Sequence, residues 1–83
     1  EAALALDDAR TAETAASDAL ASAETDADRA QALRLRAQAR LERGALPAAR
    51  EDVEAARSYA PEAIDILLLR GRINEAIRRQ QPG

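Results

Sequence analysis

Apolar residues recur at steps of three and four along most of the chain, the spacing that brings side chains onto one face of an α-helix. The pattern is clearest over residues 46–60, where apolar and charged positions separate onto two faces. The apolar face consists of Leu46, Ala49, Val53, Ala56 and Ala60. The opposite face consists of Arg50, Glu51, Asp52, Glu54 and Arg57. We therefore expect an amphipathic helix with the first set buried and the second set in solvent.

The same spacing predicts three further helices. They are expected over about residues 2–24, 27–43 and 62–80. The apolar stripe of the first consists of Ala5, Ala9, Ala12, Ala16, Ala19 and Ala23. The stripe of the second consists of Ala30, Leu33, Ala37 and Leu41. The pattern leaves open whether the first helix breaks near Arg10 and Thr11.

Polar caps, glycine and proline mark the predicted helix ends. Asp26 is placed to accept hydrogen bonds from the free amides that start the second helix, and Gly44 suits the left-handed residue that often ends one. Pro47 fits the first position of the third helix, and Pro61 ends that helix. Because β-branched and aromatic residues are few, strands are not expected, and the predicted fold class is all-α.

Composition removes most catalytic chemistry. The chain has 23 Ala and 10 Leu but only one aromatic residue, Tyr59, and it lacks Cys, His, Phe, Trp and Met. A thiolate nucleophile, an imidazole base and the usual zinc ligands are therefore excluded. The sequence Asp26-Ala27-Asp28 lacks the glycine and glutamate of a calcium loop. We expect no enzyme activity, no cofactor and no metal site.

Charge is unevenly distributed along the chain, whose net charge is −3. Residues 1–28 carry eight acids and one Arg, while residues 29–83 carry eleven Arg and seven acids. This asymmetry suits head-to-tail packing or an acidic partner, although a solvated acidic helix explains it as well. No apolar run approaches the roughly 20 residues of a membrane span. No signal peptide is visible, and nothing distinguishes cytoplasm from periplasm.

An internal correspondence appears when the chain is compared with itself at an offset of 34 residues. The aligned pairs in one direction are Leu33 with Leu67, Leu35 with Leu69, Arg36 with Arg70 and Ala37 with Gly71. Those in the other direction are Ala15 with Ala49, Asp18 with Asp52 and Asp28 with Glu62. A period of this length is typical of stacked helical hairpins.

Residues 30–63 resemble one tetratricopeptide repeat. Leu33 and Ala37 stand at the large and small positions of that family's first helix, and Gly44 falls in the turn. The second helix matches at Leu46, Ala49, Val53, Ala56 and Pro61. Two residues depart from the pattern, because Arg36 and Arg40 stand where the family usually has Leu and Tyr. Either the core is thinner there, or their aliphatic stems pack while the charged ends reach water.

The resemblance implies antiparallel helical hairpins stacked as a short solenoid in one domain, residues 1–83. Residues 1–29 would be a degenerate hairpin or one long helix, 30–63 the full repeat, 64–80 the first helix of a partial repeat, and 81–83 a tail. Such repeats bind peptides or helices on a concave face lined by each hairpin's first helix. Carried over by position, that face consists of Gln31, Arg34, Leu35, Gln38, Leu41, Glu42, Asp65, Leu68, Leu69, Arg72 and Glu75.

Two alternatives qualify this face. Each of its residues could simply be solvated helix surface. Arg34 and Arg72 together could hold a carboxylate, but the Lys/Asn clamp of some family members is missing, since the chain has no Lys and only one Asn, Asn74.

The last predicted helix has apolar residues on too many sides for one packed face. They are Ile64, Ile66, Leu67, Leu68, Leu69, Ile73 and Ile77. An end helix of a solenoid is expected to be polar outside, so we expect this surface, with Leu68 and Ile73 central to it, to meet another protein or a second copy. Folding back of the first helix, or a continuation of the chain, would cover it equally well.

The sequence thus predicts a protein–protein interaction module, a scaffold or accessory subunit. The alternative is a self-associating helical bundle whose partner is a second copy. Binding of nucleic acid through Arg29, Arg34, Arg36, Arg40, Arg43, Arg50 and Arg57 is disfavoured, because acids are interleaved and stacking aromatics are missing.

Overall fold

The computed structural model describes residues 2–81, with side chains from residue 7 onward. Four helices make up this part of the chain: α1 (Ala2–Ser22), α2 (Asp26–Glu42), α3 (Leu46–Tyr59) and α4 (Ile64–Gln80). No strand occurs between residues 2 and 81, which confirms the predicted all-α class. The helix α1 is continuous through Arg10 and Thr11, so the open question of a break there is answered by one long helix.

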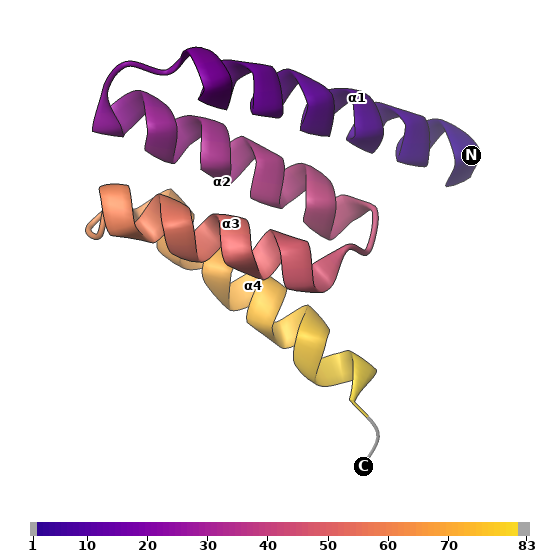
Figure 1. Cartoon of the computed structure of the whole chain (residues 1–83). Coiled ribbons are helices and arrows are strands. Elements are labelled where there is room, and N and C mark those ends of the chain that lie inside the picture. The colour runs from indigo at the N-terminus through magenta and orange to yellow at the C-terminus, as the bar shows by residue number, and fades with distance from the viewer. Residues whose placement is uncertain (1, 82–83) are drawn as a thin grey trace.

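The helices run alternately up and down, and each packs on the next (Figure 1). Helices α1, α2 and α3 lie side by side, while α4 passes behind α3 and diverges from it toward the C-terminus (Figure 1). Helix α2 also contacts α4, whereas α1 touches only α2 within the described residues. The result is an elongated array measuring 40 × 28 × 17 Å.

The start of α2 corrects one prediction. Thr25, not Asp26, is the N-cap: its extended backbone lets Oγ1 accept a hydrogen bond from the Asp28 amide at 3.0 Å. Asp26 lies in the first turn, where its carboxylate pairs with Arg29 at 3.1 Å and faces the positive end of the helix dipole. Both residue types are good N-caps and Asp is the more favoured of the two, so the residue type alone does not explain why Thr25 takes this position.

The turn between α2 and α3 forms as predicted. Gly44 has a φ of 81°, a left-handed conformation that costs residues with a Cβ about 1–2 kcal/mol. Pro47 lies in the first turn of α3, where its missing amide leaves no hydrogen bond unmade. Pro61 follows α3, and α4 begins two residues later than expected, at Ile64.

The core is built from small side chains on α2 and α3 and larger ones on α4. Its buried members are Ala30, Leu33, Ala37, Ala49, Val53, Ala56, Ile66, Leu69 and Ile73. Alanines on facing helices allow the backbones to approach closely, and the branched residues of α4 fill the space at the end of the array. Leu41 and Ala60, expected to be buried, are only partly so and pack at the edge.

The alanine stripe of α1 is only partly correct. Ala9 and Ala16 are buried and Ala23 is half-buried, but Ala12 and Ala19 are exposed. Ala5 lies outside the residues whose side chains are described. The reason is that α1 has a single neighbour, α2, so it buries a narrow stripe. Leu20 and Glu13, rather than Ala12 and Ala19, complete that stripe.

Candidate functional site

The most polar feature of the interior is a network of arginines and carboxylates between α1, α2 and α3. Asp52 of α3 is almost fully buried, although the sequence pattern placed it in solvent, so that prediction was wrong. Arg36 of α2 donates from Nε and Nη2 to the two Asp52 oxygens, each at 2.9 Å. Arg40 donates from Nη1 to the same carboxylate at 2.8 Å.

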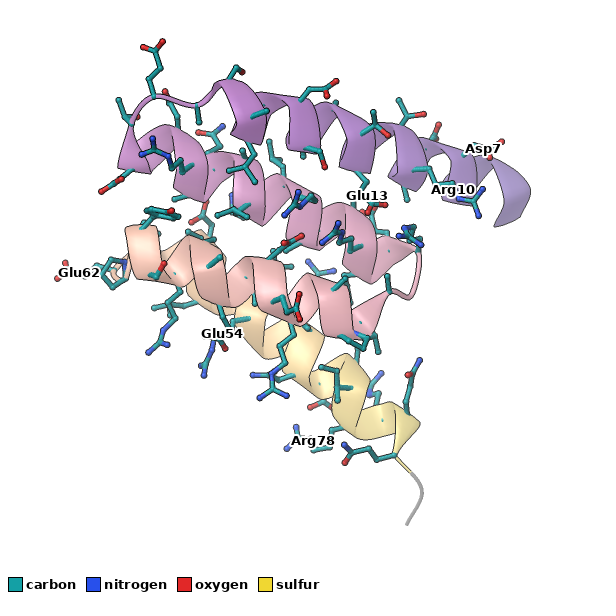
Figure 2. The ribbon with its side chains drawn as sticks, in the orientation of Figure 1. Asp7, Arg10, Glu13, Glu54, Glu62 and Arg78 are labelled. Atoms are coloured by element: carbon teal, nitrogen blue, oxygen red, sulfur yellow. The ribbon has the colours of Figure 1, made fainter. Side chains whose placement is uncertain are left out.

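The network continues to α1 through Glu13. Arg40 Nε donates to Glu13 Oε2 and Arg43 Nε donates to Oε1, both at 2.7 Å. Figure 2 shows Glu13 on the side of α1 that faces α2. The Arg43 hydrogen bond, followed by that of Arg40, lowers the pKa of Glu13 from 4.5 to about 2. Glu13 is therefore ionised at any ordinary pH.

This network is satisfied within the chain itself. Each carboxylate is paired with two guanidinium groups. No buried side-chain polar atom within residues 7–81 lacks a hydrogen-bond partner. The same residues contain no group of acids that could hold a metal ion. Arg36 and Arg40, which departed from the repeat pattern, thus join three helices through charge-assisted hydrogen bonds.

The candidate partner-binding residues on α2 spread over one side of that helix. Gln31 and Leu35 are exposed, and Leu41 is half-buried at the edge of the core. Gln38 donates to Glu42 on the same helix at 3.2 Å. Arg34 pairs with Asp65 of α4 at 3.1 Å, so two of the predicted residues meet across the α2–α4 contact.

The candidates on α4 divide between two faces. Leu68 is 65% exposed and Arg72 is exposed, so both are available to a partner. Leu69 and Ile73 are buried in this chain's own core and offer no surface. Of the two arginines predicted to hold a carboxylate together, Arg34 is already engaged through Nε by Asp65 of the same chain.

An apolar patch remains on the outer side of α4, opposite its buried face. Ile64 is 72% exposed, Leu68 65% and Leu67 41%. The buried residues Ile66, Leu69 and Ile73 account for only part of the apolar content of α4. The expectation of apolar residues on more than one side of this helix is met.

Two of the surface grooves bear on partner binding. One, of about 780 Å³, opens where α4 diverges from α3 and is lined by Leu46, Pro47, Arg50, Glu51, Glu54, Ile77, Gln80 and Gln81. The other, of about 370 Å³, lies between α1 and α2 and is lined by Ala12, Ala15, Ala16, Ala19, Leu35, Gln38, Ala39 and Glu42. The second groove, hereafter the α1–α2 groove, contains three residues of the predicted partner-binding face, Leu35, Gln38 and Glu42.

Sequence reasoning missed Asp52 as a buried acid and Glu13 as a half-buried one. One signal was present: Arg36 and Arg40 occupy positions of a helix where apolar residues are usual, which demands nearby carboxylates. In α3, the candidate partner for these arginines was Asp52, which lies one helical turn after the buried Ala49. Glu13 could not be found this way, because nothing in the sequence fixes which side of α1 faces α2.

Comparison with protein-family models, curated proteins and solved structures gives no match. The tetratricopeptide resemblance therefore depends on this chain's own residues. Within the described residues, no helix combines the length and apolarity that crossing a membrane requires.

Proposed function

We propose that this chain is a non-enzymatic protein–protein interaction module of the tetratricopeptide type, which binds a helix of another polypeptide. The observation that carries the proposal is the apolar patch of Ile64, Leu67 and Leu68 on α4. Burying one such side chain completely contributes about 1.5–3 kcal/mol. A partner helix that covers all three side chains therefore gains more binding free energy than one contact would give. Patches of this kind mark binding surfaces.

The rigidity of α4 supports this proposal. Ile66, Leu69 and Ile73 anchor the helix in the core, and Arg70 Nε donates to Glu54 of α3 at 2.7 Å. The patch is therefore presented on a helix already fixed in place, and a partner does not have to order it on binding. A partner helix with its own apolar stripe is the natural complement.

The packing order of the helices supports the repeat-type assignment. Each helix contacts its neighbours in sequence, and the only other pairing within residues 2–81 is between α2 and α4. Stacked helical hairpins have this kind of near-neighbour packing. In the middle of the array, Ala37, Ala49 and Ala56 are fully buried at the three small positions of the family pattern.

Nucleic-acid binding is less well supported. Six of the seven arginines of the predicted basic cluster are engaged by carboxylates of the chain itself, as the ion pairs of Arg29, Arg34, Arg36, Arg40, Arg43 and Arg57 show. Arg50 makes no ion pair among the side chains of residues 7–81. Little positive charge is left for phosphate.

A selection from a displayed library of peptides of about 20 residues tests the proposal, because such peptides span several helical turns. We expect selected peptides to share an apolar stripe at helical spacing. Fluorescence anisotropy should show their affinity falling at least about tenfold on Leu68→Glu, since an apolar contact is lost and a charge is buried. The exposed substitution Glu51→Gln on α3 is the matched control. Failure to select any peptide, or equal binding to the Leu68→Glu variant, would refute the proposal.

A further inference from the structure

The apolar patch of α4 has a counterpart elsewhere in the chain, visible through the 34-residue correspondence. Leu33, Arg36 and Ala37 of α2 align with Leu67, Arg70 and Gly71 of α4. In α2 these positions face α3: Leu33 and Ala37 are buried, and Arg36 bonds Asp52. In α4, Leu67 and Gly71 are exposed, and a Cβ at Gly71 would meet no atom within 4 Å. Helix α4 therefore lacks the neighbour that α2 has in α3.

The converse holds for α1. Ala15, Asp18 and Ala19 of α1 correspond to Ala49, Asp52 and Val53 of α3. The three residues of α3 are buried against the array, whereas the three of α1 are all exposed. Helix α1 thus has residues equivalent to those with which α3 packs on α2. Within the described residues, no helix packs on that face of α1.

We propose, resting on the function proposed above, that the partner of α4 is a second copy of this chain, whose α1–α2 groove receives it. Helix α4 of one copy would then pack on α1 and α2 of the next copy. This contact would repeat the one that α2 makes with α3 and α4 within a single copy. The exposed leucines agree with this arrangement, since Leu67 and Leu68 lie on α4 and Leu35 lies in the groove. The contact joins two different surfaces, so copies associate head to tail.

Charge complementarity favours this occupant over an arbitrary helix. Helix α1 contains four acids and one Arg, whereas α4 contains four Arg and two acids. The repeat places Asp18 of one copy opposite Arg70 of the other, as Asp52 lies opposite Arg36 within the chain. Arg70 donates a hydrogen bond from Nε to Glu54, and its two Nη groups donate no hydrogen bond within residues 7–81. They are free to bind a second carboxylate.

Two variants separate the two surfaces. Ala15→Arg places a long charged side chain in the α1–α2 groove and leaves α4 intact. Leu67→Glu disrupts the α4 patch and leaves the groove intact. Both positions are exposed, so both variants should fold, which circular dichroism can verify; Leu35→Glu replaces Ala15→Arg if that variant does not. Ala21→Arg is the matched control, because Ala21 is exposed on α1 about 120° around the helix from Ala15.

Light scattering after size exclusion, from about 1 µM to about 1 mM, gives the readout. We expect the wild-type mass to rise with concentration beyond twice the 8.9 kDa of one copy, because a head-to-tail contact does not close on itself. Each variant alone should remain at 8.9 kDa. An equimolar mixture of the two should form a dimer and nothing larger, through the one intact pair of surfaces. Ala21→Arg should behave as wild type.

Three results would overturn the inference. Dimers of Ala15→Arg alone would show that α4 pairs with another α4. A wild-type chain that stays monomeric throughout would show that another polypeptide occupies the patch, and peptide selection on Leu68 would then still support the proposed function. Equal effects of Ala21→Arg and Ala15→Arg would show that added charge, not the groove, controls association.

Discussion

At the scale of single residues, the arginines decide how this alanine-rich core is held together. Alanine buries little area, so the contact between α1 and α2 gains less from hydrophobic burial than one between leucines would. Glu13 and Asp52 offset this by each accepting from two arginines. Removing one member of this network leaves partly buried charged groups with one partner fewer, which costs stability.

Acid titration tests the role of Glu13. We expect Glu13→Gln to lower the free energy of unfolding near neutral pH by about 2 kcal/mol, since two charge-assisted hydrogen bonds are lost. Because the folded-state pKa is lowered from 4.5 to about 2, this contribution is complete above pH 4.5 and fades as the pH falls toward 2. The stability difference between wild type and variant should shrink over that window in urea unfolding at each pH.

The control for this titration is Glu24→Gln. Glu24 is exposed and makes no ion pair within residues 7–81, so its variant should stay within about 0.5 kcal/mol of wild type. A difference for Glu13→Gln that stays constant from pH 6 to pH 2.5 would contradict the Glu13 assignment.

At the scale of helices, the elements themselves were predictable, and their ends were predictable to within two or three residues. Helical spacing located four helices, and Gly44 and Pro47 located the turn between α2 and α3. The prediction failed where two adjacent residues could both cap the helix, since Thr25 is the N-cap although Asp26 is the more favoured type. It failed again on α1, because alanine occurs on all its faces and does not mark the buried one.

Two glycines allow a test at this scale, with opposite expected signs. Gly71→Ala should stabilise the chain by about 0.5–1 kcal/mol, because Gly71 is inside α4 and a Cβ there meets open space. Gly44→Ala should destabilise by about 1 kcal/mol or more, although it too has open space, because its φ is 81°. Thermal or urea unfolding at concentrations where the chain is monomeric measures both. Equal signs would show that the backbone conformation of Gly44 does not set the turn.

At the scale of the whole molecule, α4 covers one end of the core, but only one side of α4 is itself covered by other helices. Its inner residues Ile66, Leu69 and Ile73 share a cluster with α2 and α3, while Ile64, Leu67 and Leu68 face outward. In an array where each helix touches its neighbours, the end helices carry the unfinished surfaces. The inner face of α4 therefore contributes to stability, and the outer face is the one on which the proposed association would occur.

Substitution of one isoleucine on each face tests that division. Ile73→Ala should lower the free energy of unfolding by about 2–5 kcal/mol, because Ile73 is fully buried and a cavity remains. Ile64→Ala should change it by no more than about 0.5 kcal/mol, because Ile64 is 72% exposed. Urea unfolding of the monomer gives both values. Similar losses for the two variants would place both faces of α4 in one folded core.

The sequence by itself determined the all-α class, the order of the helices, the glycine turn, and the excess of apolar residues on α4, while the continuity of α1 through Arg10 and Thr11 was left to the structure. These follow from local spacing and local backbone preferences, which do not depend on distant residues. Only the tertiary structure decided that Asp52 is buried, that Glu13 joins two arginines, and that Leu69 and Ile73 belong to the core while Leu68 does not. Those facts depend on which helix faces lie against one another, and in a chain this rich in alanine that choice is made by packing across residues 12–30 positions apart.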